Sequence, residues 1–542
     1  MRKVIQPQRK LGQIDISKIE IDLRCRDEIP KVLLGLQHIY CNPEIREKVF
    51  KLLQELIPEN ISADNGRPGM DLWKIIVLGC VRLTCNWNFD KLHDIANNHQ
   101  TIREMLGHGA MDKDIEAKYS LQALKDNVSL FTPEILERIN KIVVEAGHNL
   151  LNLKGKGKGK RKKNEKNGEL NLESDSTLNT LKLHGRCDSF VVETNVHFPS
   201  DINLLFDAFR KMVTLISRLC GDLDIWGWRN GAANIKEVKK LFHKVRKMKR
   251  SNSKDPVRIA KKEEMIKKAH LAYISLVEFY LDRADNSMHD IKMKGSISEN
   301  KISEIEGYMV HVDRQVDQIR RRVIGGESIA HEEKVFSIFE EHTEWISKGK
   351  AGVPQELGLK VCILEDQYGF ILHNRVMENE TDEKVAVPVI EDTKKKYTNL
   401  SRCSFDKGFY SPENKRRLME LLELVILPKK GKLSESDKRM EHSEEFVLGR
   451  RKHSGVESAI NGLENHGLDR CLDHGLYGFK RYVSFAVLTR NIETLGSLIR
   501  KQQLKSLKRK ERNERKEKEK GKAKFLIDDG GIGLEIEELR AA

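Results

Sequence analysis

Three acidic side chains of this sequence could take part in metal-assisted phosphoryl chemistry. Asp188 interrupts an apolar, strand-like stretch, and Asp406 ends a second such stretch just before a Gly-Phe-Tyr turn and a charged helix. Glu457 lies in the segment RRKHSGVESAI, with a histidine one helical turn before it. Transfer or hydrolysis of a phosphodiester needs an activated nucleophile and a stabilised leaving oxygen, and two divalent ions about 4 Å apart can supply both. Hard ions such as Mg²⁺ prefer carboxylate oxygens, so these residues are candidate metal ligands.

Each of these carboxylates also has a structural explanation. An aspartate at a junction between a strand and a helix most often caps the helix, and a glutamate on a surface helix is usually a solvated charge. Asp188 is harder to explain in this way, because apolar strands do not favour aspartate. For Asp406 the local sequence is compatible with both a cap and a metal ligand. The choice depends on whether other carboxylates lie near it.

The elements that would position these residues follow from the hydrophobic pattern. Residues 184–198 are rich in β-branched and aromatic residues and predict a strand. Residues from about 202 to 348 predict helices with basic polar faces. Two apolar runs within 360–377 flank a Gly-containing turn and predict a hairpin, and 401–431 predicts a strand, a helix and a strand. With a further helix beginning near Ser454, we expect an α/β core with a long helical insertion after its first strand.

The flanking regions predict further parts. Residues 1–150 indicate an N-terminal all-helical domain, in which Asn88–Gly107 has the outline of a helix-turn-helix with its second helix at Thr101–Leu106. Many helical bundles share this outline, but in a basic chain it makes this domain a candidate for DNA binding. Residues 151–180 form a flexible basic linker, either merely solvated or following DNA phosphates, and 498–542 form a basic C-terminal helix and tail.

Composition narrows the possible partners and location. The 542 residues contain 97 Lys+Arg against 82 Asp+Glu, a net charge of +15, which favours nucleic acid first and an acidic membrane surface second. The nine cysteines show no C-x-x-C spacing, so a structural zinc site is not expected. No apolar segment follows Met1, and the longest apolar stretches, such as 72–83, are too short to span a membrane. We therefore expect a cytoplasmic protein.

Four blocks of the chain, in this order, resemble DDE-type bacterial insertion-sequence transposases, the ISNCY group in particular. The resemblance covers roughly residues 186–497, with a weaker similarity over 43–107. The blocks are CDSFVVETNVHFPSDINLLFDAFRK, WISKGKAGVPQELGLKVCILEDQYGFILHNRVMENETDEKVAVP, FDKGFYSPENKRRL with LVILPKKGK, and RRKHSGVESAINGLENHGLDRCLDHGLYGFKRYVSFAVLTRNIETLG. Several blocks in the right order are more specific than any one of them.

The resemblance implies a ribonuclease-H-like catalytic domain over residues 181–497. In it, Asp188, Asp406 and Glu457 would be the first, second and third catalytic carboxylates and would together hold two Mg²⁺ ions, with Mn²⁺ as a substitute. Related transposases often carry a Lys or Arg one to two turns after the catalytic Glu to hold phosphate. Here Glu464 occupies that place, and Arg470 is the candidate to serve instead.

The predicted function is that of a DNA transposase in the bacterial cytoplasm, associated with the nucleoid. Water would nick the ends of the element, and the freed 3′-OH would attack target DNA. The expected partners are double-stranded element ends and target DNA, bound by a homodimer or larger assembly. The candidates for phosphate contact are Arg450, Arg451, Lys452 and His453, although such a run is often a solvated face. Two alternatives remain: a DNA-binding regulator or decayed transposase that does not cut, and a structure-selective nuclease of the same fold.

Overall fold

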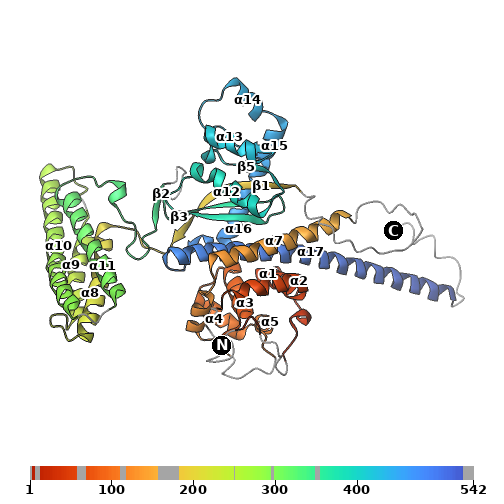
Figure 1. Ribbon diagram of the computed structural model, residues 1–542, viewed down its shortest axis with the longest axis horizontal. Helices are drawn as coiled ribbons and strands as arrows, with labels where there is room; N and C mark the ends of the chain where they lie inside the picture. The colour runs from red at the N-terminus through yellow and green to blue at the C-terminus, as the bar shows by residue number, and fades with distance from the viewer. Residues whose placement is uncertain are drawn as a thin grey trace. The chain divides into compact units, whose positions relative to one another are not determined.

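The computed structural model describes most of the chain (Figure 1). Most of the predicted linker, from residue 157 onward, and the end of the tail after residue 528 lie outside the described residues. The chain divides into two compact units, the larger containing 1–192, 360–473 and 477–542 and the smaller containing 193–359 and 474–476. The described residues are 3–5, 13–57, 69–109, 118–156, 182–249, 251–294, 298–347 and 354–528.

The larger unit begins with helices. They are η1 (Ile16–Lys18), α1 (Glu28–Cys41), α2 (Pro43–Gln54), α3 (Leu72–Thr84), α4 (Phe89–Asn98), α5 (Gln100–Met105), α6 (Leu121–Val128) and α7 (Pro133–Lys156). The expected second helix of the helix-turn-helix is therefore α5, and it has only six residues, of which Ile102 and Met105 are buried. Capping side chains define several starts; for example, the Asn88 side chain accepts a hydrogen bond from the backbone N–H of Lys91.

The buried helix α3 packs closely against the long helix α17 (Gly475–Asp528). A Cβ atom added at Gly79 would overlap the Phe485 ring, so only glycine permits this approach. Arg82 of α3 is buried and pairs with Asp473, 3.2 Å away. The N-terminal helices thus share a core with the C-terminal part of the catalytic candidate region.

The sheet has seven strands: β1 (Leu183–Thr194), β2 (Glu344–Ser347), β3 (Gln355–Glu365), β4 (Ile371–Met377), β5 (Leu400–Phe405), β6 (Leu424–Ile426) and β7 (Arg470–Cys471). Its order is β2-β3-β1-β5-β6, while β4 also pairs with β3 and β7 with β1. The pairs β1·β5 and β5·β6 are parallel, and β2·β3 and β3·β4 are antiparallel. The α/β prediction is confirmed at this level: the chain is mostly helical and carries a mixed sheet.

Helices connect the strands of the larger unit. Helix α12 (Asp382–Lys396) joins β4 to β5, and α13 (Pro412–Leu421) joins β5 to β6. The hairpin expected at 360–377 is present, with Gly369 at φ +86° in its turn. Between β6 and the helix expected near Ser454, the chain also forms α14 (Glu435–Glu441) and α15 (Glu444–His453), which the sequence did not predict. It continues through α16 (Gly455–Leu463) and the π-turn η7 (Glu464–Leu468).

The smaller unit contains four long helices that lie side by side around an apolar core (Figure 1). They are α8 (Asp201–Asp222), α9 (Gly231–Arg246), α10 (Pro256–Met293) and α11 (Glu299–Ile319), followed by the short turns η4 (Arg320–Ile324) and η5 (His331–Glu333). The helical part of this insertion therefore ends at Glu333, and β2 lies within the stretch for which helices were expected. No helix in the described parts of the chain is long and apolar enough to cross a membrane.

Candidate active site

Asp188, within β1, and Asp406, directly after β5, lie at equivalent places of two neighbouring strands. The parallel register pairs Arg186 with Ser404 and Cys187 with Phe405. The next residue of each segment is one of the two aspartates. The backbone of Asp406 is still extended, at φ −73° and ψ 161°, so the alternation of the strand continues to it. Adjacent strands are about 4.8 Å apart, so the sheet itself brings the two aspartates together.

Asp406 does not serve as a helix cap through its side chain. It stands at the N-cap position of the short 3₁₀ turn η6 (Lys407–Phe409), but its carboxylate accepts no capping hydrogen bond there. Its side chain is exposed. The capping explanation for Asp406 therefore lacks its defining hydrogen bond, whereas a carboxylate available to a ligand agrees with the geometry.

The junction between α15 and α16 docks on the strand pair just before the two aspartates. The His453 Nδ1 atom lies 3.0 Å from the Ser404 hydroxyl oxygen. Two residues later, a Cβ atom added at Gly455 would overlap the Arg186 guanidinium, so the start of α16 lies directly on Arg186. Ser404 and Arg186 are register partners, so the junction touches both strands at the same level.

The packing of the α15–α16 junction on β1 and β5 places the first turn of α16, which carries Glu457, near the two aspartates. Glu457 lies in the first turn of α16, and its backbone N–H bonds to the Ser454 carbonyl at 3.3 Å. Its carboxylate is close enough to raise the pKa of Asp188, as is that of Asp406. The sheet register thus unites two of the predicted carboxylates, and the helix junction adds the third.

The electrostatics of Asp188 reflect this crowding. Burial raises the pKa of Asp188 to about 6, and the carboxylates of Asp406, Asp382 and Glu457 add to the rise. A hydrogen bond from the Ser189 N–H, 2.7 Å from Asp188 Oδ1, opposes it. A divalent cation would relieve the same repulsion, and all the donors are hard oxygens. Among the described residues, no group of three or more His, Cys, Asp or Glu side chains already has the spacing to hold a metal ion.

Asp382 is a fourth carboxylate of this site that the sequence did not reveal. Its Oδ1 atom accepts a hydrogen bond from the Ser189 hydroxyl at 2.6 Å, and its Oδ2 atom is 3.1 Å from Lys360 Nζ. A Cβ atom added at Gly408 would stand 3.1 Å from Asp382 Oδ2. Asp382 therefore contacts Ser189, which directly follows Asp188, and Gly408, which lies two residues after Asp406. In the sequence it is only the first acidic residue of a helix, which is an ordinary position for aspartate.

Gly408 lies in the η6 turn directly after the exposed Asp406, and it is not among the glycines with positive φ. Its lack of a side chain leaves room for the Asp382 carboxylate.

Arg186 forms a half-buried link between β1 and β3 beside this site. Its guanidinium is 2.8 Å from the Glu365 carboxylate and donates to the Asp366 carbonyl at 2.7 Å. Burial raises the pKa of Glu365 to about 7, against the opposing effect of Arg186. Arg186 was not predicted from the sequence, where a cation in a strand has no distinguishing pattern.

The predicted phosphate contacts separate into two kinds. Arg450, Arg451 and Lys452 are exposed at the end of α15, as a phosphate-binding group requires. His453 is half-buried, and burial lowers its pKa while Asp406 and Glu457 oppose the change. It therefore belongs to the docking contact with Ser404 rather than to the exposed run. Arg470 is exposed in β7, the short strand paired with β1.

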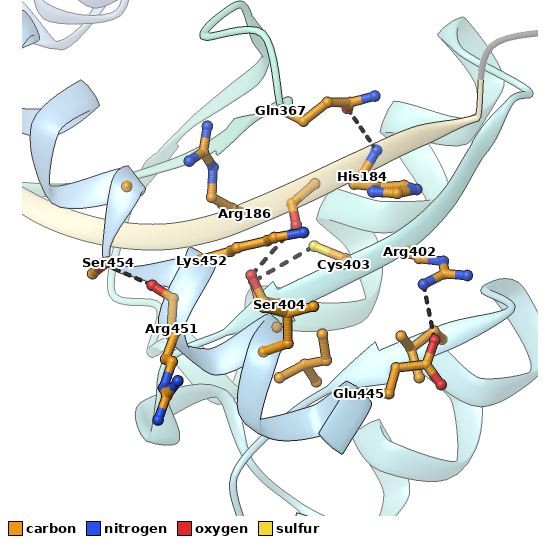
Figure 2. A pocket seen from close by; sticks show the side chains of 16 residues that line it. His184, Arg186, Gln367, Arg402, Cys403, Ser404, Glu445, Arg451, Lys452 and Ser454 are labelled. Carbon is orange, nitrogen blue, oxygen red and sulfur yellow. Dashed lines mark hydrogen bonds and ion pairs between the residues drawn. The ribbon is translucent and has the colours of Figure 1, made fainter. Parts of the chain in front are cut away.

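A pocket of about 590 Å³ adjoins the site on the larger unit (Figure 2). It lies where β1, β5 and β6 face α15 and the start of α16, and Arg186 and Ser404 are part of its wall. Figure 2 shows the Lys452 side chain lying across it and Arg402 paired with Glu445 at its edge, at 2.9 Å. Arg186 and Ser404 each stand two residues before one of the aspartates, so the pocket wall lies next to the candidate site.

Comparisons with models of known protein families, with curated proteins and with solved structures found no match to this chain.

Proposed function

We propose that this chain is a Mg²⁺-dependent DDE-type DNA transposase built on a ribonuclease-H-like core. The observations that carry the proposal are that the β1·β5 register places Asp188 beside Asp406 and that Glu457 is close enough to act electrostatically on Asp188. The three residues come from a first strand, the end of its parallel neighbour and a late helix. They are separated by 218 and 51 residues along the chain (406 − 188 and 457 − 406), and their order Asp, Asp, Glu is the order of ligands that the family resemblance implies.

The strand arrangement supports the proposed core. The series β4-β3-β1-β5-β6 begins with an antiparallel hairpin, β3·β4, and ends with the parallel strands β1, β5 and β6. A helix separates β4 from β5 and another separates β5 from β6. That is the strand order and connection expected of a ribonuclease-H-like domain, with the helical insertion following its first strand.

In this proposal, different residues have different roles in the reaction. Asp188, Asp406 and Glu457 would hold the metal ions, which when bound would activate the attacking oxygen and neutralise charge on the phosphate. The exposed cations Arg450, Arg451 and Lys452 would bind DNA phosphates beside the scissile bond. Arg186 and His453 would hold the helix of Glu457 against the sheet. Phosphoryl transfer depends largely on positioning and charge neutralisation, and this division supplies both.

A DNA-binding protein that does not cut is the second candidate. Glu464 favours it, because this exposed carboxylate stands where related transposases often place a phosphate-holding cation. A repulsive charge there would weaken the grip on the DNA end without removing the basic surface.

One assay separates these functions. Labelled DNA from both flanks of the gene is incubated with a supercoiled target and Mg²⁺, and cleavage, joining and binding are measured separately. Cleavage with joining supports a transposase, cleavage alone a nuclease, and binding alone a regulator. The matched variant is Asp406→Asn, which should bind DNA and fail to cut. Undiminished cleavage by this variant would contradict the proposed site.

A further inference from the structure

The buried carboxylate of Glu493, on α17, contacts basic side chains from three different elements. Only 5% of this residue is exposed. Its Oε2 atom lies 3.0 Å from His466 Nε2 in η7 and accepts a hydrogen bond from the Arg490 guanidinium, one turn earlier on α17, at 2.7 Å. Its Oε1 atom accepts from Lys31 Nζ of α1 at 3.3 Å. One side chain thus links the turn that follows α16, the long C-terminal helix and the N-terminal helices.

Stability alone does not explain this ionic group. Burial by itself would raise the pKa of Glu493, but the hydrogen bond with His466 and the charges of Arg490 and Lys31 outweigh burial and lower the pKa to about 2. Glu493 is therefore charged over the ordinary pH range, and its three contacts persist. Replacing such a buried ionic group by apolar residues of similar volume is often neutral or stabilising. A role in fixing the arrangement of the three elements gives a reason for its presence.

Helix α16 contacts an arginine at each end of one face. Gly455 and Gly462 are seven residues apart, close to two full turns, so they lie on the same face of α16. A Cβ atom added at Gly455 would overlap the Arg186 guanidinium, and one at Gly462 would stand 3.1 Å from the guanidinium carbon of Arg490. Arg490 is in turn held by Glu493. The first end of α16 therefore depends on Arg186, and the second end depends on Arg490 and its carboxylate partner.

The turn η7, which continues α16, is fixed by the same carboxylate. His466 leaves the helical conformation, and Gly467 follows at φ +92°. A Cβ atom added at Gly467 would stand 2.7 Å from the Tyr482 hydroxyl oxygen of α17 and 3.2 Å from Asn86 Oδ1, which lies just after α3. The turn is therefore enclosed by residues of two helices, and the buried His466 ring contacts Glu493 from within it. A shift of this turn would be transmitted directly to α16.

Helix α1 approaches α17 closely enough to act as a fixed support. A Cβ atom added at Gly496 would overlap the carbonyl oxygen of Lys31, and one at Gly35 would overlap the carbonyl oxygen of Ile492. The two backbones therefore touch through two glycines, one on each helix. The ion pair between Lys31 and Glu493 lies within this contact, at 3.3 Å.

We propose that Glu493 is a positioning residue for Glu457. Through His466 and Arg490 it fixes the end of the helix that carries Glu457, and through Lys31 it makes α1 part of the same support. This inference rests on the proposed function, because it takes Glu457 as a metal ligand. It adds that the N-terminal helices, the candidate DNA-binding part of the chain, also hold a catalytic carboxylate in place. Loss of Glu493 should therefore slow the reaction without weakening DNA binding.

The test separates the rate of cleavage from the affinity for DNA, with labelled duplex DNA from the flanks of the gene as the probe. Glu493→Gln removes the charge at nearly constant volume. Its single-turnover cleavage rate at saturating DNA and Mg²⁺ should fall about 10- to 100-fold, as expected for a displacement of up to about 1 Å at a catalytic group. The dissociation constant for the same DNA in Ca²⁺ should stay within about twofold of the wild-type value. Glu493→Asp keeps the charge and should recover part of the lost rate.

Asp473→Asn is the matched control for lost stability. The Asp473 side chain is 9% exposed and pairs with two arginines, Arg82 of α3 at 3.2 Å and Arg481 of α17 at 2.9 Å. These partners lie on α3 and α17 rather than on α16 or η7. Breaking either buried ionic group should lower the urea midpoint of unfolding. Asp473→Asn should nevertheless keep the cleavage rate within about threefold of wild type.

A wild-type cleavage rate in folded Glu493→Gln would overturn the proposal, as would an equal loss of rate in Asp473→Asn. If Glu493→Gln does not fold, Lys31→Gln decides. It removes only the link to α1 and should slow cleavage while DNA affinity stays unchanged, whereas an unchanged rate would overturn the role of α1.

A second measurement makes the two proposals fail separately. Mg²⁺ bound at the carboxylates should raise the unfolding temperature. Glu493→Gln should need about tenfold more Mg²⁺ than wild type for half of this shift, within the range for losing a residue that orients a metal ligand, and Asp473→Asn should not. If the wild type shows the shift without cleavage, the transposase is contradicted, and the Mg²⁺ titration of Glu493→Gln decides the positioning role. A wild type with neither cleavage nor the shift would contradict both proposals.

Discussion

Asp188 and Asp406 lie side by side where the parallel β1·β5 ladder ends, each directly after the last registered partners, Cys187 and Phe405. This register is the strongest constraint on the candidate site, because both aspartates depend on the same ladder of backbone hydrogen bonds. A slip of one residue would turn one carboxylate to the opposite face of the sheet. The buried neighbours Cys187 and Phe405 resist such a slip, since it would expose them.

The carboxylate cluster should reduce the stability of the metal-free protein. Burial and its acidic neighbours raise the pKa of Asp188 from 3.8 to about 6, which corresponds to a penalty of at most about 3 kcal/mol once the group is ionised. The folded protein holds this proton more tightly than the unfolded chain, so the penalty develops as pH rises from about 4 to 6 and is complete above 6. Asp188→Asn should therefore be more stable than the wild type at pH 8 and nearly equal to it at pH 4, as measured by urea unfolding without divalent ions.

The comparison has an internal control. Asn can still accept the hydrogen bond from the Ser189 N–H, so the variant removes charge and keeps the local contact. The same variant should have no detectable cleavage activity. A loss of stability in Asp188→Asn at pH 8 would mean that Asp188 is a structural residue and would contradict its assignment to the site.

Binding of divalent ions should offset the loss of stability that the ionised Asp188 causes, and this binding should depend on pH. An ion at the carboxylates competes with the proton on Asp188, so its binding should weaken as pH falls below about 6. At pH 5, one unit below that pKa, the apparent affinity for Mg²⁺ should be about tenfold lower than at pH 8. The measurement is the shift in unfolding temperature across a Mg²⁺ titration at both pH values. Asp406→Asn should lose most of the shift, and an equal shift in that variant would locate the ion elsewhere.

The sequence predicted the main strands and the helix that carries Glu457 because each has a marked local pattern. β-Branched and aromatic residues indicate β1, the Gly-containing turn indicates the β3–β4 hairpin, and Ser454 stands at the start of α16. It did not predict α14 and α15. Their sequences are too charged to show an apolar period. Both helices begin at capping serines, and α15 also packs against β5 and β6.

The long-range contacts that assemble the site could not be predicted from the sequence either. Asp382 is 194 residues from Asp188 along the chain (382 − 188) and has the local character of any acidic helix start. The contact between Arg186 and Gly455 forms only because α16 packs on β1, and neither residue shows this contact in its local sequence. Such long-range contacts depend on how elements pack, and local propensity carries no information about them.

Gly455 should be required for activity more than for folding. An alanine methyl there would displace either the Arg186 guanidinium or the start of α16, and with it Glu457. A shift of about 1 Å at a catalytic group can cost roughly 100-fold in rate, so Gly455→Ala should lose cleavage to that extent while unfolding cooperatively. Gly307→Ala is the matched control, because Gly307 also lies in a helix and has nothing within 4 Å of its added Cβ. Full activity in Gly455→Ala would show that the position of α16 tolerates the change.

Asp382 should tune the pH dependence of cleavage through Asp188. Its carboxylate helps to raise the pKa of Asp188, so Asp382→Asn should lower that pKa and extend activity to more acidic pH. Asn can still accept the hydrogen bond from the Ser189 hydroxyl, so the rate at pH 8 should change by less than about threefold if charge is the main effect. The measurement is the ratio of single-turnover cleavage rates at pH 5.5 and pH 8, which should rise in Asp382→Asn. Glu383→Gln, the exposed neighbour on the same helix turn, should leave the ratio unchanged. A ratio that stays at the wild-type value in Asp382→Asn would show that Asp382 does not act on Asp188 during the reaction.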